Sequence, residues 1–172
     1  YVTNYLELHD ECWPTSGGQR MVKTIDTVAP HDDEYAKGRT KLAQGIVMTA
    51  PGIPAMLQGT EWLEDTDFGT DSGNRIDWSK KTTYSGIFDY YSDFIHLRTS
   101  NPALRADAGL ETFHVNESGH VIGFQRYGWG EVVVVVANFS NTDYSDYRIG
   151  LPIPCHRHEA INSQAPEYEG GG

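Results

Sequence analysis

The feature that most constrains the fold of this chain is a change of hydrophobic pattern near residue 109. Before it, short apolar runs alternate with stretches whose apolar residues recur at helical spacing, which predicts the order strand, helix, strand, helix. After it, short apolar runs are separated by turn residues, which predicts antiparallel β-structure. Because two parallel strands cannot form a sheet that stands alone, we expect the first half to be the end of a larger α/β unit.

The first half contains two clear helix signals. Asp32, Asp33 and Glu34 precede one of them, and negative charge suits the positive end of a helix dipole. Pro51 and Gly52 end that helix, and Pro102 closes the second. The predicted elements are a strand over 1–8, a helix over 32–50, a strand over 53–57 and a helix over 87–98.

The second half is predicted to be a β-sandwich. Closely spaced apolar runs with Gly, Asn, Asp and Pro between them are typical of that architecture. The predicted strands are 110–115, 121–125, 132–137, 147–149 and 158–161. The fold class is therefore α/β followed by all-β, with a boundary between residues 1–106 and 107–172.

Composition excludes several classes of partner. Lys and Arg number 13 and Asp and Glu 24, so the formal net charge is −11. Nucleic acids and anionic membrane surfaces are bound mainly by clustered Lys and Arg, so both are disfavoured, whereas a neutral substrate is compatible. No apolar run approaches the length that spans a bilayer. The cysteines, Cys12 and Cys155, do not form a disulfide framework.

The strongest local candidate for chemistry is His9-Asp10-Glu11, at the end of the first predicted strand. A carboxylate beside an imidazole can stabilise positive charge or hydrogen-bond a polar substrate, and catalytic groups of α/β barrels lie at the carboxyl ends of strands. Taken alone, the tripeptide is explained more simply by a loop-capping Asp beside a satisfied surface His. The residues alone leave both interpretations open.

A second candidate follows the strand predicted at 53–57. Gln58-Gly59-Thr60-Glu61-Trp62 is a polar segment in which Gly59 permits close approach of the backbone. Glu61 and Trp62 could face a cleft. An ordinary surface loop is the alternative.

Metal binding has weak support. Cys155-His156-Arg157-His158 has no second Cys or His pair nearby in sequence, so a zinc site is not expected. The acidic cluster of Asp32, Asp33 and Glu34 could bind calcium, but a charged helix N-terminus explains it more simply. We expect no cofactor and leave calcium open.

Three segments in order carry a family resemblance. Residues 5–11, Tyr-Leu-Glu-Leu-His-Asp-Glu, resemble the strand-seven motif of the α-amylase superfamily of retaining glucosidases and transglycosylases. Residues 49–64 look like the strand-eight motif of that superfamily. The third segment, which contains Asn138-Phe139-Ser140, a Tyr-Arg-Ile-Gly run at 147–150 and residues 161–171, is similar to the C-terminal β-domain of 1,4-α-glucan branching enzymes.

The resemblance implies a fold and a set of site residues. The chain would hold strands seven and eight of a (β/α)₈ barrel with their helices, and most of a C-terminal β-domain. Asp10 would be the transition-state stabiliser and His9 would bind substrate. Glu11 would bind substrate on the acceptor side or support the loop as a scaffold, and Glu61 and Trp62 would lie at the rim of the site. The nucleophile and the general acid would precede residue 1, so the chain alone is expected to be inactive.

The resemblance also implies an activity. The parent protein would be a 1,4-α-glucan branching enzyme of glycogen or starch metabolism, transferring an α-1,4 chain to a 6-hydroxyl by a retaining mechanism. Hydrolysis of starch or maltooligosaccharides is one alternative, because the loop Cys12-Trp13-Pro14-Thr15-Ser16 departs from the branching pattern. A non-catalytic carbohydrate-binding module is another. The expected partner is an α-glucan such as glycogen, amylose or a maltooligosaccharide, and the expected location is the cytoplasm, with secretion as the alternative.

Overall fold

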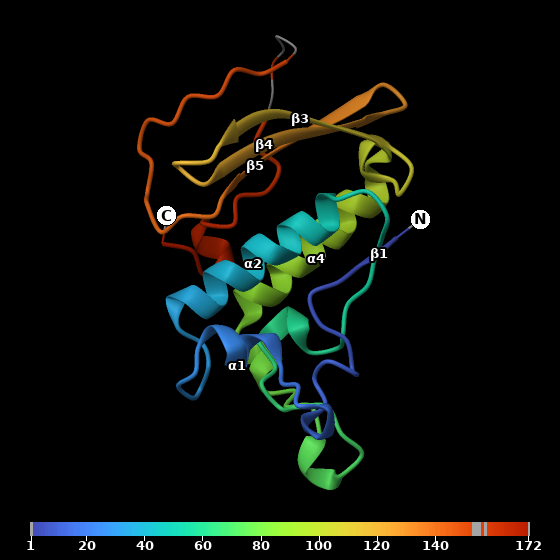
Figure 1. The fold of residues 1–172 in the computed structure, drawn as a ribbon, viewed down its shortest axis with the longest axis vertical. Coiled ribbons are helices and arrows are strands. Elements are labelled where there is room, and N and C mark those ends of the chain that lie inside the picture. The colour runs from blue at the N-terminus through green and yellow to red at the C-terminus, as the bar shows by residue number, and fades with distance from the viewer. Residues whose placement is uncertain (1, 153–155, 157, 172) are drawn as a thin grey trace.

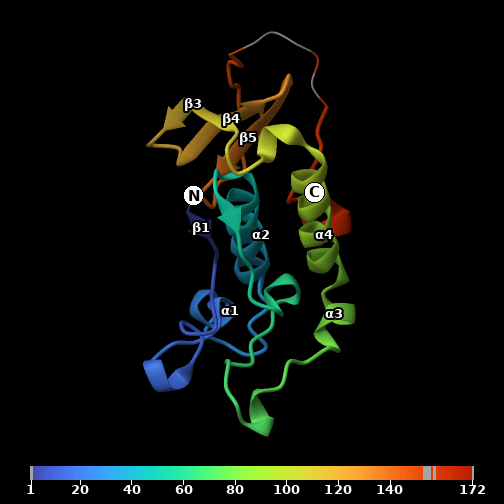
Figure 2. The same cartoon turned by 90° about the vertical axis from the view of Figure 1, so that its right-hand side faces the viewer.

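The computed structural model describes residues 2–152, 156 and 158–171. Two long helices, α2 (Glu34–Thr49) and α4 (Ser85–Ser100), lie side by side at its centre (Figures 1 and 2). A three-stranded sheet covers one end of this pair, and a group of loops with short helices lies at the other end. None of the helices in the described part has the length and hydropathy that crossing a membrane requires.

The first half has the predicted order, but its strands are much shorter than expected. β1 (Thr3–Asn4) pairs in parallel with β2 (Ile53–Pro54), and α2 connects them. Gly52 has φ of +104°, and a Cβ there would lie 2.6 Å from the carbonyl oxygen of Val2, so only glycine allows this pairing. The strands predicted over 1–8 and 53–57 shrink to these two pairs of residues, and no barrel is evident among the described residues.

Both predicted long helices are confirmed. The carboxylate of Asp33 accepts a hydrogen bond from the backbone N–H of Ala36 at 2.6 Å and so caps α2. At the other end, the Arg98 guanidinium from α4 donates to the carbonyls of Ala50 at 3.0 Å and Gly52 at 2.6 Å. This cation satisfies carbonyls at the C-cap of α2 and in the turn that follows it. Two short helices, α1 (Met21–Ile25) and α3 (Lys80–Thr83), were not predicted.

The second half forms one antiparallel sheet. Its strands are β3 (Gly109–Asn116), β4 (Val121–Gly128) and β5 (Glu131–Asn138), in that order. They confirm three of the predicted strands.

The prediction of a sandwich is wrong for the described residues, because segments 147–149 and 158–161 are not strands. Around Tyr147, side-chain bonds replace a β-ladder, since its hydroxyl lies 2.8 Å from Nε2 of His114 and 2.8 Å from Nδ2 of Asn116.

One buried arginine attaches the sheet to the helices. Arg126 of β4 is fully buried, and it donates to the carbonyls of Thr49 at the end of α2, Arg105 and Gly109. A buried guanidinium is tolerated only when its donors are paired, and here they are paired with backbone on both sides of residue 106. The division of the chain into 1–106 and 107–172 stays a prediction.

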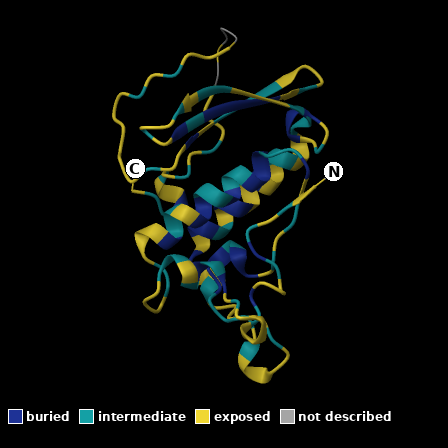
Figure 3. Cartoon of the chain, in the orientation of Figure 1, coloured by how far each residue is buried: buried dark blue, intermediate teal, exposed yellow. Residues whose placement is uncertain are grey.

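Residues 163–168 of the C-terminal segment pack on the two long helices. The ring of Tyr168 lies 5.3 Å from that of Tyr90, and its hydroxyl donates to Asp93 at 2.6 Å. Lys41 of α2 is 1% exposed, and its ammonium donates to the carbonyls of Ser163 at 2.6 Å and Tyr168 at 2.8 Å. Buried residues gather along this contact and between the helices (Figure 3).

Burial of Lys41 predicts a pH dependence of stability. Burial lowers the pKa of this ammonium from 10.5 to about 8, so between these values the unfolded chain binds a proton that the native chain does not. The stability of the wild type relative to the Lys41→Met variant should therefore rise as the pH is raised through this range. Urea unfolding of both proteins at about pH 7.5 and about pH 9.5 measures this, and an unchanged or falling difference would contradict it.

Candidate functional site

A buried carboxylate joins the loops that follow β1 and β2. Glu7 is 5% exposed. It accepts hydrogen bonds from Nη1 of Arg20 at 2.9 Å, the backbone N–H of Met21 at 2.7 Å and the hydroxyl of Thr60 at 2.7 Å. The chain after β1 is thereby fixed both to the start of α1 and to the chain after β2.

The Arg20 side chain completes this connection. It is buried, and its Nη2 donates to the carbonyl of Gln58 at 2.7 Å. Gly59 makes room for it, because a Cβ on that residue would lie 2.4 Å from Nη2, and its φ is +100°. The close backbone approach predicted for Gly59 is thus present, and it serves the buried ion pair of Glu7 and Arg20.

His9 and Asp10 lie on the loop that this ion pair holds. Nε2 of His9 is 3.1 Å from Oδ1 of Asp10, and the two side chains are 54% and 83% exposed. They occupy a turn in which Glu11 and Cys12 donate backbone hydrogen bonds to Leu8, each at 3.1 Å. The expectation that they stand at the end of a strand is wrong, since β1 ends at Asn4. The turn leaves an open carboxylate beside an imidazole, which can hydrogen-bond the hydroxyls of a bound molecule.

Glu11 has a local structural role. Its carboxylate accepts from the hydroxyl of Tyr5 at 3.1 Å and from the backbone N–H of Leu8 at 3.0 Å. The hydrogen bond to Glu11 also raises the pKa of Tyr5. Both carboxylate oxygens therefore stabilise the turn that carries Asp10, and the predicted contact of Glu11 with substrate stays untested.

The two candidates after β2, Glu61 and Trp62, have different surroundings. Glu61 accepts from the backbone N–H of Gly59 at 2.8 Å and so stabilises its own turn. Trp62 is 2% exposed, and its ring lies 5.1 Å from that of Trp78 and 6.3 Å from that of Phe88. The prediction that Trp62 lies at a rim is wrong in this structure, because an indole between two aromatic rings is a core residue.

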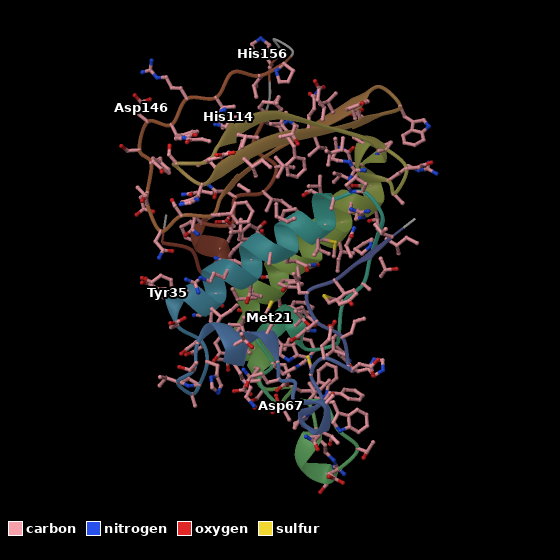
Figure 4. All side chains as sticks on the ribbon, viewed as in Figure 1. Met21, Tyr35, Asp67, His114, Asp146 and His156 are labelled. Carbon is pink, nitrogen blue, oxygen red and sulfur yellow. The ribbon has the colours of Figure 1, made fainter. Side chains whose placement is uncertain are left out.

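A third loop adds residues that the sequence did not single out. Asp67 accepts from the backbone N–H of Arg20 at 3.2 Å and from the Lys23 ammonium at 2.6 Å. The neighbouring Phe68 donates its N–H to the carbonyl of Cys12 at 3.0 Å. Figure 4 labels Asp67 in this group of loops, at the opposite end of the molecule from His114 of the sheet.

Sequence reasoning missed Glu7, Arg20 and Phe68. Glu7 carried the one available signal, because it is a charged residue inside the apolar run of residues 5–8. A charge at such a place is either exposed or paired, and here it is paired. The loops that contain Arg20 and Phe68 have no periodicity from which their contacts could be predicted.

The acidic cluster before α2 is used by the protein itself. Asp33 caps the helix, and Asp32 accepts from the hydroxyl of Tyr84 at 2.8 Å. Across 2–152, 156 and 158–171, no three His, Cys, Asp or Glu side chains are grouped as a metal site would need. Cys155 and Arg157, which belong to the segment considered for zinc, lie outside the described residues.

The second half of the chain matches a known family. Residues 114–172 fit the family described as alpha amylase, C-terminal all-beta domain.

Relatives extend the similarity to most of the chain. A 1,4-α-glucan branching enzyme of Mycobacterium sp. (strain JLS) is 31% identical over 152 residues, which are 83% of this chain and 20% of that protein. A pullulanase of Bacillus subtilis (strain 168) is 26% identical over 169 residues, which are 88% of this chain and 22% of that protein. The chain thus spans about a fifth of the length of the relatives it matches.

The fold is also similar to that of solved enzymes. A pullulanase from Anoxybacillus sp. LM18-11, crystallised with maltotetraose, aligns with a TM-score of 0.64 and 25% identity, over 80% of this chain and 22% of that one. An α-amylase from Geobacillus thermoleovorans, crystallised with acarbose, aligns with a TM-score of 0.56 and 23% identity, over 78% of this chain and 26% of that one.

Proposed function

The chain belongs to the α-amylase superfamily, and on this premise we propose that it is part of an enzyme that acts on α-glucans. The observation that carries the proposal is the exposed pair of His9 and Asp10, 3.1 Å apart. Their turn is fixed from beneath by the buried ion pair of Glu7 and Arg20. A charged group that is open to solvent, on a turn that a buried ion pair holds rigid, suits a preorganised binding site.

Asp10 is proposed to stabilise the transition state. Glycosyl transfer passes through an oxocarbenium-like state with positive charge on the sugar ring, and a nearby carboxylate lowers its energy. Nε2 of His9 beside Asp10 would hydrogen-bond the same sugar. The nucleophile and the acid/base carboxyl of such a reaction would come from outside these 172 residues.

The finer proposal is chain transfer. The branching enzymes among the relatives support an activity in which an α-1,4 chain is moved to a 6-hydroxyl of another glucan. The expected acceptor and donor are then neutral polysaccharide, which agrees with a net charge of −11 and needs no basic surface. A place in glycogen or starch synthesis, and a cytoplasmic location, are part of the same proposal.

The test of this proposal is the product made from a linear glucan. The complete native protein is incubated with amylose, and iodine colour, reducing ends and α-1,6 linkages are followed together. Branching lowers the iodine colour and creates α-1,6 linkages without a matching rise in reducing ends. A rise in reducing ends without new linkages would contradict transfer and support hydrolysis.

Hydrolysis is the second candidate, and the similarity to pullulanases favours it. The assay with amylose detects hydrolysis of α-1,4 bonds, and the same assay with a branched glucan detects hydrolysis of α-1,6 bonds. Amylose and branched glucan that are both bound but left unchanged would instead support a carbohydrate-binding module.

A further inference from the structure

Beside the pair of His9 and Asp10 lies a group of three aromatic rings. The ring of Phe68 is 5.5 Å from that of His9 and 5.6 Å from that of Trp13. His9 and Trp13 belong to the loop after β1, whereas Phe68 belongs to the loop after β2. Two loops that are distant in sequence thus bring their aromatic side chains together at one place.

The rings remain partly open to solvent. Phe68 is 36% exposed, Trp13 is partly buried, and the side chain of His9 is 54% exposed. The ring planes of His9 and Phe68 make an angle of 59°, and those of Trp13 and Phe68 make an angle of 62°. The contacts are therefore tilted and edge-on, and the rings do not stack face to face. Partly exposed aromatic surface next to a carboxylate combines the apolar and polar features of a small-molecule site.

The backbone beneath these rings is held in place. The N–H of Phe68 donates to the carbonyl of Cys12 at 3.0 Å, directly beside Trp13. The preceding residue, Asp67, forms an ion pair with Lys23 at 2.6 Å, and its carbonyl accepts from Nδ2 of Asn74 at 3.0 Å. Bonds at Phe68 and at the residue before it therefore fix this part of the loop, so the aromatic surface exists before any ligand binds.

We propose that Trp13 and Phe68 form a stacking subsite for one glucosyl ring of an α-glucan, next to the ring that Asp10 and His9 hold. The inference rests on the proposed function and adds to it the residues that bind the neighbouring sugar. A glucosyl ring has an apolar C–H face that packs against an aromatic ring, while its hydroxyls point outward to polar partners. Phe68, in contact with His9 and Trp13 alike, connects the two positions.

Binding of maltoheptaose to the complete native protein tests the subsite. Isothermal titration should give a dissociation constant about tenfold weaker for Trp13→Ala and for Phe68→Ala, because each loses one stacking surface. Phe68→Leu should also bind weakly, whereas Phe68→Tyr keeps the ring and should bind like the wild type. Phe139→Ala removes a ring that is 56% exposed on the other half of the chain, and is the matched control that should leave binding unchanged.

Failure of the subsite proposal and failure of the proposed function would give different results. Wild-type affinity in both Trp13→Ala and Phe68→Ala, with normal turnover of glucan, would overturn the subsite and leave the proposed function standing. Absence of maltoheptaose binding and of turnover in the wild type would overturn the proposed function itself. Thermal unfolding of each variant shows whether it has a folding defect. The dissociation constants of Phe68→Tyr and Phe68→Leu are then compared, and equal values would show that the aromatic ring does not contribute to binding.

Discussion

Replacing Asp10 with Asn is expected to lower the kcat of the complete enzyme on amylose by about 10²- to 10³-fold, with little change in KM. The substitution keeps the size of the side chain and removes its charge. A negative charge is worth most when the sugar ring becomes positive, so its loss affects the transition state more than the bound ground state. The Asp10 side chain is 83% exposed and has a single short contact, to His9, so the substitution should leave the fold intact.

The control for this variant is Glu117→Gln. Glu117 is an exposed carboxylate in the turn between β3 and β4, and that sheet lies at the other end of the helix pair from the group of loops that follows β1. It loses the same charge and should keep full activity. Equal losses of activity in both variants would show that net charge matters and Asp10 does not. Asp10→Asn with wild-type kcat would remove the proposed role altogether.

Replacing Arg20 with Met is expected to destabilise the native protein by about 3–5 kcal/mol. The side chains of Arg20 and Glu7 are 3% and 5% exposed, so the substitution leaves a carboxylate buried without its cation. The carbonyl of Gln58 also loses its donor. Urea unfolding measures the change.

Two further variants identify the cause of that loss. The double variant Glu7→Gln/Arg20→Met removes the unpaired charge and should recover part of the stability. Arg148→Met breaks the ion pair with Asp146, whose side chains are 86% and 74% exposed, and should have no measurable effect. If Arg20→Met is as stable as the wild type, the ion pair does not hold the loops together.

The helices could be predicted from the sequence, whereas the strand lengths could not. Helical spacing and the capping residue Asp33 are local features, and α2 and α4 follow them closely. A strand needs a partner, and β1 and β2 have only each other among the described residues, so their pairing stops after two residues each. Segment 147–149 has strand-like residues, but Tyr147 bonds to the side chains of β3 instead of to a neighbouring strand.

Only the polar part of the candidate site could be predicted. Adjacent residues such as His9 and Asp10 are visible in a sequence as one motif, so they could be singled out. The contacts of Glu7 with Thr60 and of Phe68 with Trp13 join residues 53 and 55 positions apart, and no local pattern specifies them. Trp62 was misplaced for a related reason, because burial between Trp78 and Phe88 depends on how distant segments pack.

The most direct test of the account is a crystal structure of the complete protein with maltotetraose. We expect hydroxyls of one glucosyl ring within about 2.6–3.2 Å of the Asp10 carboxylate and of Nε2 of His9. A sugar chain bound elsewhere, with Asp10 and His9 facing only solvent, would contradict it.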